Sequence, residues 1–136
     1  MRQRWPRSIM GEIHHGRKIM TRNEYFRIEQ GDRVTCLRFL DTSRLDTDDY
    51  AQLQRDLVDF VESHLPNKLI VDLSEIVYCS TALINALLMA ERRVRANNGT
   101  MHLFGLNEYM LDTLQRLKLV DTIFSICSDE STAQSA

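Results

Sequence analysis

Two adjacent hydroxyl residues, Ser80 and Thr81, stand where a polar loop gives way to the apolar segment Ala82–Leu88. A serine at the start of a helix accepts a hydrogen bond from a backbone N–H, which is worth about 1 kcal/mol. The same position is electropositive and tolerates an added phosphate. Phosphorylation adds about −1.5 to −2 charges at pH 7 and would disturb a partner docked there. The residue type alone favours a plain helix cap, with a phosphorylation switch as the alternative.

The cysteines and histidines form no metal-binding or catalytic pattern. No CxxC pair occurs, and Cys36, Cys79 and Cys127 each lie in or beside an apolar segment, as buried thiols do. The nucleotide-binding, zinc-hydrolase and serine-hydrolase motifs are missing from the sequence. The sequence therefore predicts no catalytic residue, no metal and no cofactor. Cys79 precedes a helix start, which lowers a thiol pKa, so a redox sensor is the alternative to a buried structural cysteine.

The elements that position Ser80 alternate between strands and helices. Strands are predicted by the alternating or continuous apolar patterns of 25–30, 33–40, 68–73, 101–104 and 122–127. Helices are predicted from Asp46 or Thr47 to Leu65, from Ser80 or Thr81 to Ala96, after the Asn107 cap, and over 131–135. In the helix after Asn107, Met110, Leu111, Leu114 and Leu117 are expected to form the buried stripe. The order β-β-α-β-α-β-α-β-α indicates one α/β domain with a mixed sheet packed with helices.

The segment from Asp72 to Leu88 carries a resemblance to a known family. It reads Asp-Leu-Ser at the end of a strand, then Cys79-Ser80-Thr81-Ala82-Leu83 at a helix start. This resembles the signature of the STAS domain, the module of the anti-sigma factor antagonists, in which Asp-Leu-Ser leads to Asp-Ser-Ser/Thr-Gly-Leu. Cys79 replaces the family's aspartate and Ala82 its glycine. Further similar segments are Ser43–Asp46, Asn98–Leu106 and Leu117–Ile126, so the resemblance extends from about Tyr25 to Ala133.

The resemblance implies a regulatory partner switch rather than an enzyme. It implies phosphorylation of Ser80, with Thr81 as second choice, and partner contacts through Tyr78, Cys79, Ser80, Thr81, Ala82 and Leu83. The implied partner is an anti-sigma factor or serine kinase of the histidine-kinase-like ATPase type, released when the serine is phosphorylated. The alternative is an assembly subunit that is not phosphorylated, either a stress-complex scaffold or a transporter accessory subunit. A third reading is a small-ligand binder with a pocket near the same loop.

Charge divides the chain into two parts. Residues 1–22 hold six basic residues and one acidic residue, a net charge of +5, whereas the remainder carries −7. We interpret 1–22 as a poorly ordered basic leader and 23–136 as the STAS-type domain. A basic arm can bind nucleic acid, but a solvated leader is the simpler interpretation, so no nucleic acid binding is expected. No apolar run reaches the roughly 20 residues of a membrane-spanning helix, and no signal peptide pattern occurs, which predicts a cytoplasmic protein without membrane insertion.

Overall fold

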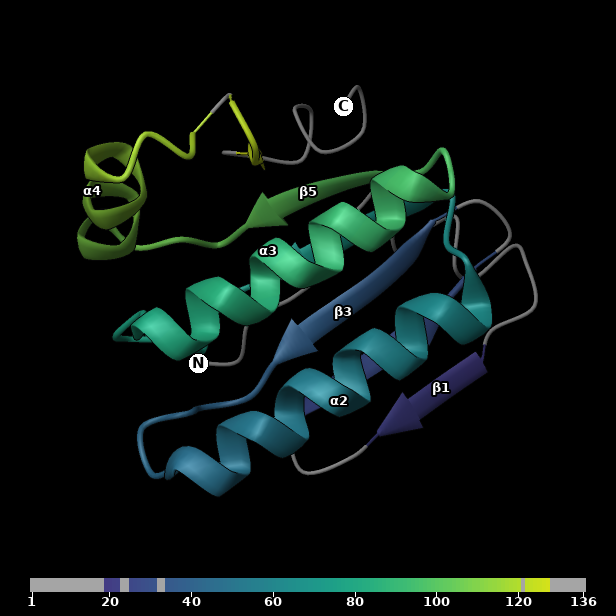
Figure 1. Cartoon of the computed structure of the whole chain (residues 1–136), viewed down its shortest axis with the longest axis horizontal. Coiled ribbons are helices and arrows are strands. Elements are labelled where there is room, and N and C mark those ends of the chain that lie inside the picture. Colours follow the sequence, from purple (N-terminus) through teal and green to yellow (C-terminus); the bar gives the residue numbers. More distant parts are fainter. Residues whose placement is uncertain (1–18, 23–24, 32–33, 121, 128–136) are drawn as a thin grey trace.

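A six-stranded β-sheet forms the frame of the domain (Figure 1). The computed structural model describes residues 19–22, 25–31, 34–120 and 122–127. The strands are β1 Ile19–Arg22, β2 Phe26–Gln30, β3 Thr35–Phe39, β4 Lys68–Asp72, β5 Thr100–Phe104 and β6 Ser125–Cys127. They lie side by side in chain order. β1, β2 and β3 pair antiparallel, and β3 to β6 pair parallel. The mixed sheet expected from the sequence is confirmed.

Three helices occupy the connections of the parallel part: α2 Thr47–His64, α3 Thr81–Ala96 and α4 Glu108–Arg116. α2 and α3 lie next to each other on the same face of the sheet (Figure 1). Parallel strands point the same way, so the loops that leave β3, β4 and β5 meet at one edge, together with the helix starts. The expected helix starts are confirmed at each of these three helices. In the part of the chain that the structure describes, no helix is long and apolar enough to cross a membrane.

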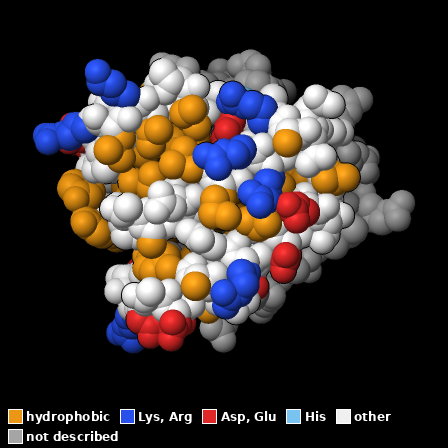
Figure 2. Space-filling model, viewed as in Figure 1, with side chains coloured by type: hydrophobic (Ala, Val, Ile, Leu, Met, Phe, Trp, Pro, Cys, Tyr) orange, Lys and Arg blue, Asp and Glu red, His pale blue; other side chains and the backbone are white. Residues whose placement is uncertain are grey.

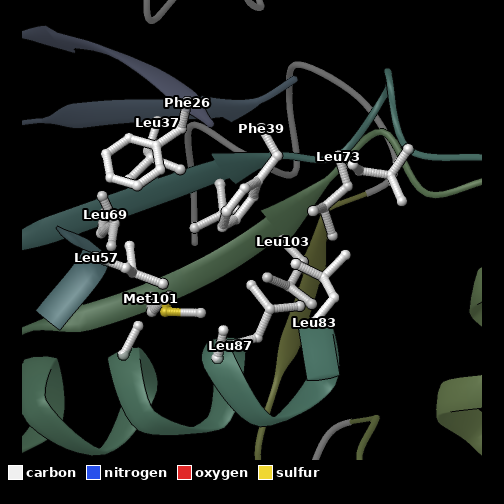
Figure 3. Packing of buried hydrophobic residues seen from close by; sticks show 14 of the residues in the cluster. Phe26, Leu37, Phe39, Leu57, Leu69, Leu73, Leu83, Leu87, Met101 and Leu103 are labelled. Atoms are coloured by element: carbon white, nitrogen blue, oxygen red, sulfur yellow. The ribbon is translucent and has the colours of Figure 1, made fainter. Parts of the chain in front are cut away.

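The sheet has two different faces. Leu37, Val71 and Leu103 are neighbours across β3, β4 and β5 and belong to the hydrophobic core beneath the helices. Figure 3 shows strand residues such as Met101 and Leu103 beside Leu83 and Leu87 of α3. The adjacent row, which includes Cys36, Ile70 and His102, points away from the helices because side chains alternate along a strand. We call the side that carries this row the far face.

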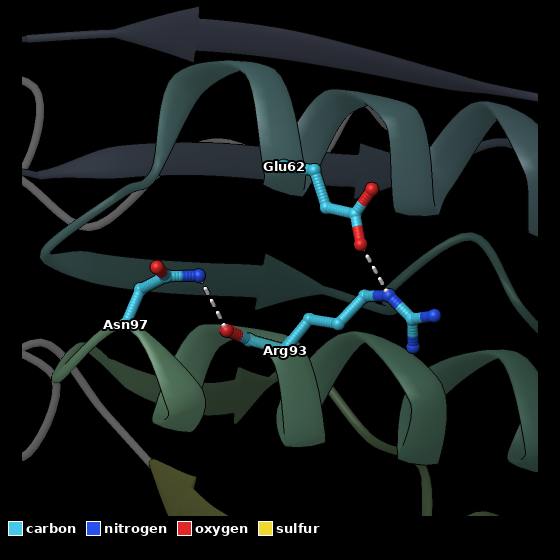
Figure 4. Close-up of polar contacts among 3 residues, drawn as sticks. All are labelled: Glu62, Arg93 and Asn97. Carbon is cyan, nitrogen blue, oxygen red and sulfur yellow. Dashed lines mark hydrogen bonds and ion pairs between the residues drawn. The ribbon is translucent and has the colours of Figure 1, made fainter.

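Local hydrogen bonds fix the helix starts at the positions expected from the sequence. At the start of α2, Asp46 and Asp49 form a capping box, with Asp49 N donating to Asp46 Oδ1 at 2.8 Å. At the start of α4, Asn107 Oδ1 accepts from Met110 N at 2.7 Å. Arg93 of α3 donates to Glu62 of α2 at 2.8 Å and so links the two helices (Figure 4).

The structure adds one strand to the expected order and corrects one helix face. β1 was not predicted. It pairs with β2 through backbone hydrogen bonds, which need no hydrophobic pattern, and it lies within the segment assigned to the leader. Leu117 was expected in the buried stripe of α4, but the helix ends at Arg116 and Leu117 is 53% exposed. The remaining leader residues, 1–18, and the predicted final helix, 131–135, lie outside the described residues.

Candidate functional site

Ser80 is the N-cap of α3. Its backbone is extended, with φ −75° and ψ 162°, and its Oγ accepts a hydrogen bond from Leu83 N at 3.1 Å. The side chain is half-buried, while Thr81, the first helical residue, is exposed. The first turn of α3 contains no acidic residue. The positive end of the helix dipole therefore faces Ser80 without a neighbouring carboxylate in that turn, which suits an added phosphate.

The residues predicted to contact a partner divide between the surface and the core. Tyr78 is 62% exposed, and Ala82 is half-buried. Cys79 and Leu83 are 4% and 0% exposed and lie in the hydrophobic core. These two side chains point inward and hold the loop and the helix start against the sheet, and their predicted contact with a partner stays a prediction.

Cys79 has the properties of a structural thiol. Burial raises the pKa of Cys79 to about 11, so the thiol is protonated at neutral pH and a poor nucleophile. The lowering expected from the helix start is outweighed by desolvation, which disfavours the charged thiolate. This supports the structural interpretation of Cys79 over the redox sensor. Among the residues described, no group of three or more histidine, cysteine or carboxylate side chains is placed to hold a metal ion.

An exposed aromatic patch lies beside Ser80 and consists of Val77, Tyr78 and Tyr109. Their exposed fractions are 74%, 62% and 52%, and the two tyrosine rings stack with centroids 5.6 Å apart. Asn107 Nδ2 donates to Val77 O at 3.1 Å and so ties the start of α4 to the loop before Ser80. Figure 2 shows hydrophobic side chains gathered on the left of the view, on the side where α4 and the start of α3 lie.

Val77 and Tyr109 were not predicted from the sequence as members of this surface. Val77 is an apolar residue within a predicted loop, and Tyr109 lies outside the apolar stripe of α4. Both residues could have been predicted as exposed from the sequence. Val77 lies in a loop and Tyr109 lies off the buried stripe of its helix, so neither has a core position to fill.

A pocket of about 380 Å³ opens beside Ser80. It lies between the loop that follows β3, which contributes Asp41 to Ser43 and Leu45, and the loop that precedes α3, which contributes Val77, Tyr78 and Ser80. Tyr50 of α2 also lines it. The Asp41 carboxylate is held in place by Ser43, whose N and Oγ each donate to it at 3.0 Å. The pocket has room for a small molecule or a side chain of a partner.

The turn at the end of β4 sets the path of the loop that leads to Ser80. Asp72 is fully buried, and its Oδ1 accepts from Ser74 N at 2.9 Å. Among the described residues no hydrogen bond reaches its Oδ2. Burial raises the pKa of Asp72, and the Ser74 hydrogen bonding and the Arg38 charge offset only part of this effect. Gly105, after β5, packs directly against this turn.

We expect Asp72→Asn to stabilise the domain at pH 7. The pKa of Asp72 in the folded domain lies above the ordinary value of 3.8. The protonated side chain therefore contributes to the free energy of unfolding. This contribution is complete below pH 3.8 and is lost as the pH rises through the folded-state pKa. Asparagine keeps the Oδ1 acceptor and does not ionise, so the free energy of unfolding at pH 7 should rise. Urea unfolding at several pH values measures this, and the gain should vanish as the pH falls toward 3.8.

The matched control is Asp112→Asn, which removes an exposed carboxylate paired with Arg116. Its effect should stay within about 0.5 kcal/mol at pH 7. A loss of stability at pH 7 in Asp72→Asn would show that the ionised carboxylate is needed for the turn.

Comparisons with known proteins agree with this geometry. The family model described as STAS domain matches residues 25–133. Three similar solved structures are a STAS domain protein from Planctomyces limnophilus, the anti-sigma factor antagonist SpoIIAA in its unphosphorylated form, and the Bacillus SpoIIAA in its phosphorylated form. Their identities to this chain are 16%, 13% and 15%, and their TM-scores are 0.67, 0.64 and 0.59. Each match covers 81% of this chain and 96%, 94% and 97% of the other, respectively. At such identities the likeness shows the fold. No curated protein matches the chain.

Proposed function

The chain belongs to the STAS domain family, and from that premise we propose that it is a regulatory partner switch controlled by phosphorylation of Ser80. The observation that carries the proposal is the position of the Ser80 hydroxyl, at the N-terminus of α3 and next to the exposed aromatic patch. SpoIIAA, which has the same fold, has been solved in a phosphorylated and an unphosphorylated form. The proposed function is binding, and it involves no catalysis by this chain.

The geometry explains how one phosphate would change binding without unfolding the domain. The helix dipole and the backbone N–H groups at the start of α3 stabilise an anion, so the fold tolerates the modification. The same phosphate lies beside Tyr78 and Thr81, which are exposed on the surface that a partner would cover. A partner docked there would have to dehydrate the new charge, so the phosphorylated form releases it.

The charges around the patch indicate the chemistry of the partner. Exposed Asp41, Asp48 and Glu108 lie at this end of the domain, with Arg44 as a nearby exposed cation. A complementary partner has an apolar centre and a basic rim. We propose an anti-sigma factor or serine kinase of the histidine-kinase-like ATPase type, acting in the cytoplasm.

The direct test of the switch is phosphorylation of the purified protein by such a kinase with ATP. We expect mass spectrometry to find phosphate on Ser80, with Thr81 as the second position. Ser80→Ala should bind the kinase but gain no phosphate at residue 80, and it should lose about 1 kcal/mol of stability with the cap. Thr81→Ala is the matched control and should still be phosphorylated on Ser80. If the partner binds but neither residue is modified, the domain is an assembly subunit without this switch.

A further inference from the structure

A groove of about 270 Å³ lies between α2 and α3, which pack next to each other on the side of the sheet opposite the far face (Figure 1). Figure 2 shows hydrophobic side chains interspersed with basic and acidic ones over these two helices. Val58 of α2 and Met89 of α3 are half-buried in the groove. Its other lining residues are Ala51, Gln54, Arg55 and Asp59 of α2. The groove therefore combines apolar side chains with one cation and one anion.

Arg55 and Asp59 are one helical turn apart on α2 and carry opposite charges, yet they do not pair with each other. Charged residues four positions apart on a helix are neighbours and often form an ion pair. Arg55 Nη2 instead donates to Gln52 Oε1 at 2.7 Å, and Gln52 Nε2 donates to Asp56 Oδ1 at 2.7 Å. Among the residues that the structure describes, neither Arg55 nor Asp59 has an ion-pair partner, although both are exposed.

The order of these groups along α2 is complementary to itself. Val58 lies close to the midpoint between Arg55 and Asp59. A second α2 that crosses antiparallel, with Val58 of both copies at the same level, places Arg55 of each copy opposite Asp59 of the other. A two-fold dimer requires this property, because each contact occurs twice with the roles of the two chains exchanged. The lining residues carry no net charge, which favours such a partner over a strongly acidic or basic one.

We propose that a second copy of this chain docks on the groove between α2 and α3. The two α2 helices run antiparallel, Val58 and Met89 of both copies form the apolar centre, and two Arg55–Asp59 ion pairs flank it. α2 has 18 residues and is roughly 27 Å long, so it can form the length of the interface. Met89 lies roughly 13 Å along α3 from Ser80, so the groove is separate from the surface around Ser80. This inference is independent of the proposed switch.

The first test is analytical ultracentrifugation of the full chain over a range of protein concentrations. We expect a reversible equilibrium between the mass of one chain and the mass of two chains, shifting to the dimer as the concentration rises. The mass of one chain at every concentration up to about 1 mM would overturn the proposal.

The second test uses two charge reversals that repel their own copies and attract each other. In Arg55→Asp and in Asp59→Arg, like charges face each other across the two-fold axis. Each variant alone should therefore dimerise about tenfold more weakly than the unmodified chain, or worse. In an equimolar mixture of the two variants, opposite charges face each other at both positions, so a dimer with one copy of each should form with an affinity within about threefold of the original.

The mixture separates an intermolecular contact from an effect within one chain, because each variant keeps its own defect. The matched control is Arg116→Asp, which reverses an exposed charge on α4 and should dimerise like the unmodified chain. Circular dichroism checks that each variant is folded, and recovery in the mixture is itself evidence of folding. Absence of recovery in a mixture of folded variants would overturn the antiparallel pairing. Single reversals that dimerise as well as the control would overturn it too, since the dimer would then use another surface.

Discussion

Tyr109→Ala is expected to weaken partner binding by about 30-fold or more, which corresponds to the 2 kcal/mol or more of an interface hot spot. Tyr109 is 52% exposed and stacks on Tyr78, so the pair presents a rigid apolar surface beside Ser80. Tyrosines lose little conformational entropy on binding because two torsions define the side chain. The measurement is titration calorimetry or surface plasmon resonance with the kinase that phosphorylates Ser80.

The matched control is Leu117→Ala at the opposite end of α4. Leu117 is 53% exposed, so its truncation removes a similarly exposed apolar side chain that lies outside the aromatic patch. Its effect on binding should stay below threefold, since less than 1 kcal/mol is typical away from a hot spot. Equal effects of the two substitutions would show that the partner does not recognise the aromatic patch.

The helix starts were predictable from the sequence because they are fixed locally. Asp46, Ser80 and Asn107 each cap a helix, and residue type and position predicted starts near Asp46 or Thr47, near Ser80 or Thr81, and at Asn107. The central strands were predictable because a strand buried on both faces, such as Lys68–Asp72, reads as a continuous apolar run. β1 was not predictable in this way, because its place in the sheet depends on backbone pairing with β2.

The helix start at Ser80 was predictable, but the surface around it was not. Ser80 was correctly expected at or next to a helix start, yet adjacency in sequence does not tell which side chains of a loop point outward. Cys79 and Leu83 were therefore assigned to the contact surface, although both are buried. Tyr109 is 29 positions from Ser80 along the chain, and only the fold brings it to the Tyr78 ring.

The two departures from the family signature, Cys79 and Ala82, fit their places in the structure. Cys79 fills a core position, where a carboxylate would be costly to bury. Ala82 lies in the first turn of α3 and has no positive φ, so a glycine is not required there. Neither substitution disturbs the cap that Ser80 makes with Leu83.

The glycine that this site does require is Gly105, which follows β5. Its φ is +82°, a region that disfavours residues with a Cβ. A Cβ at Gly105 would lie 2.8 Å from Asp72 Oδ1 and 3.0 Å from Ser74 N. The Asp72–Ser74 turn begins the loop that leads to Ser80, so a shift there would be transmitted to the aromatic patch.

We therefore expect Gly105→Ala to lower the free energy of unfolding by about 3 kcal/mol, from backbone strain of about 1–2 kcal/mol and overpacking of similar size. Urea unfolding measures the loss. The control is Lys118→Gly, because exposed Lys118 also has a positive φ, of 59°. Glycine there should raise the free energy of unfolding by about 1 kcal/mol by relieving the same backbone strain at an exposed position. The loss at Gly105 should exceed that gain, since the difference measures the contact with Asp72 and Ser74. A loss at Gly105 no larger than the gain at Lys118 would show that Gly105 is not closely packed against the Asp72–Ser74 turn.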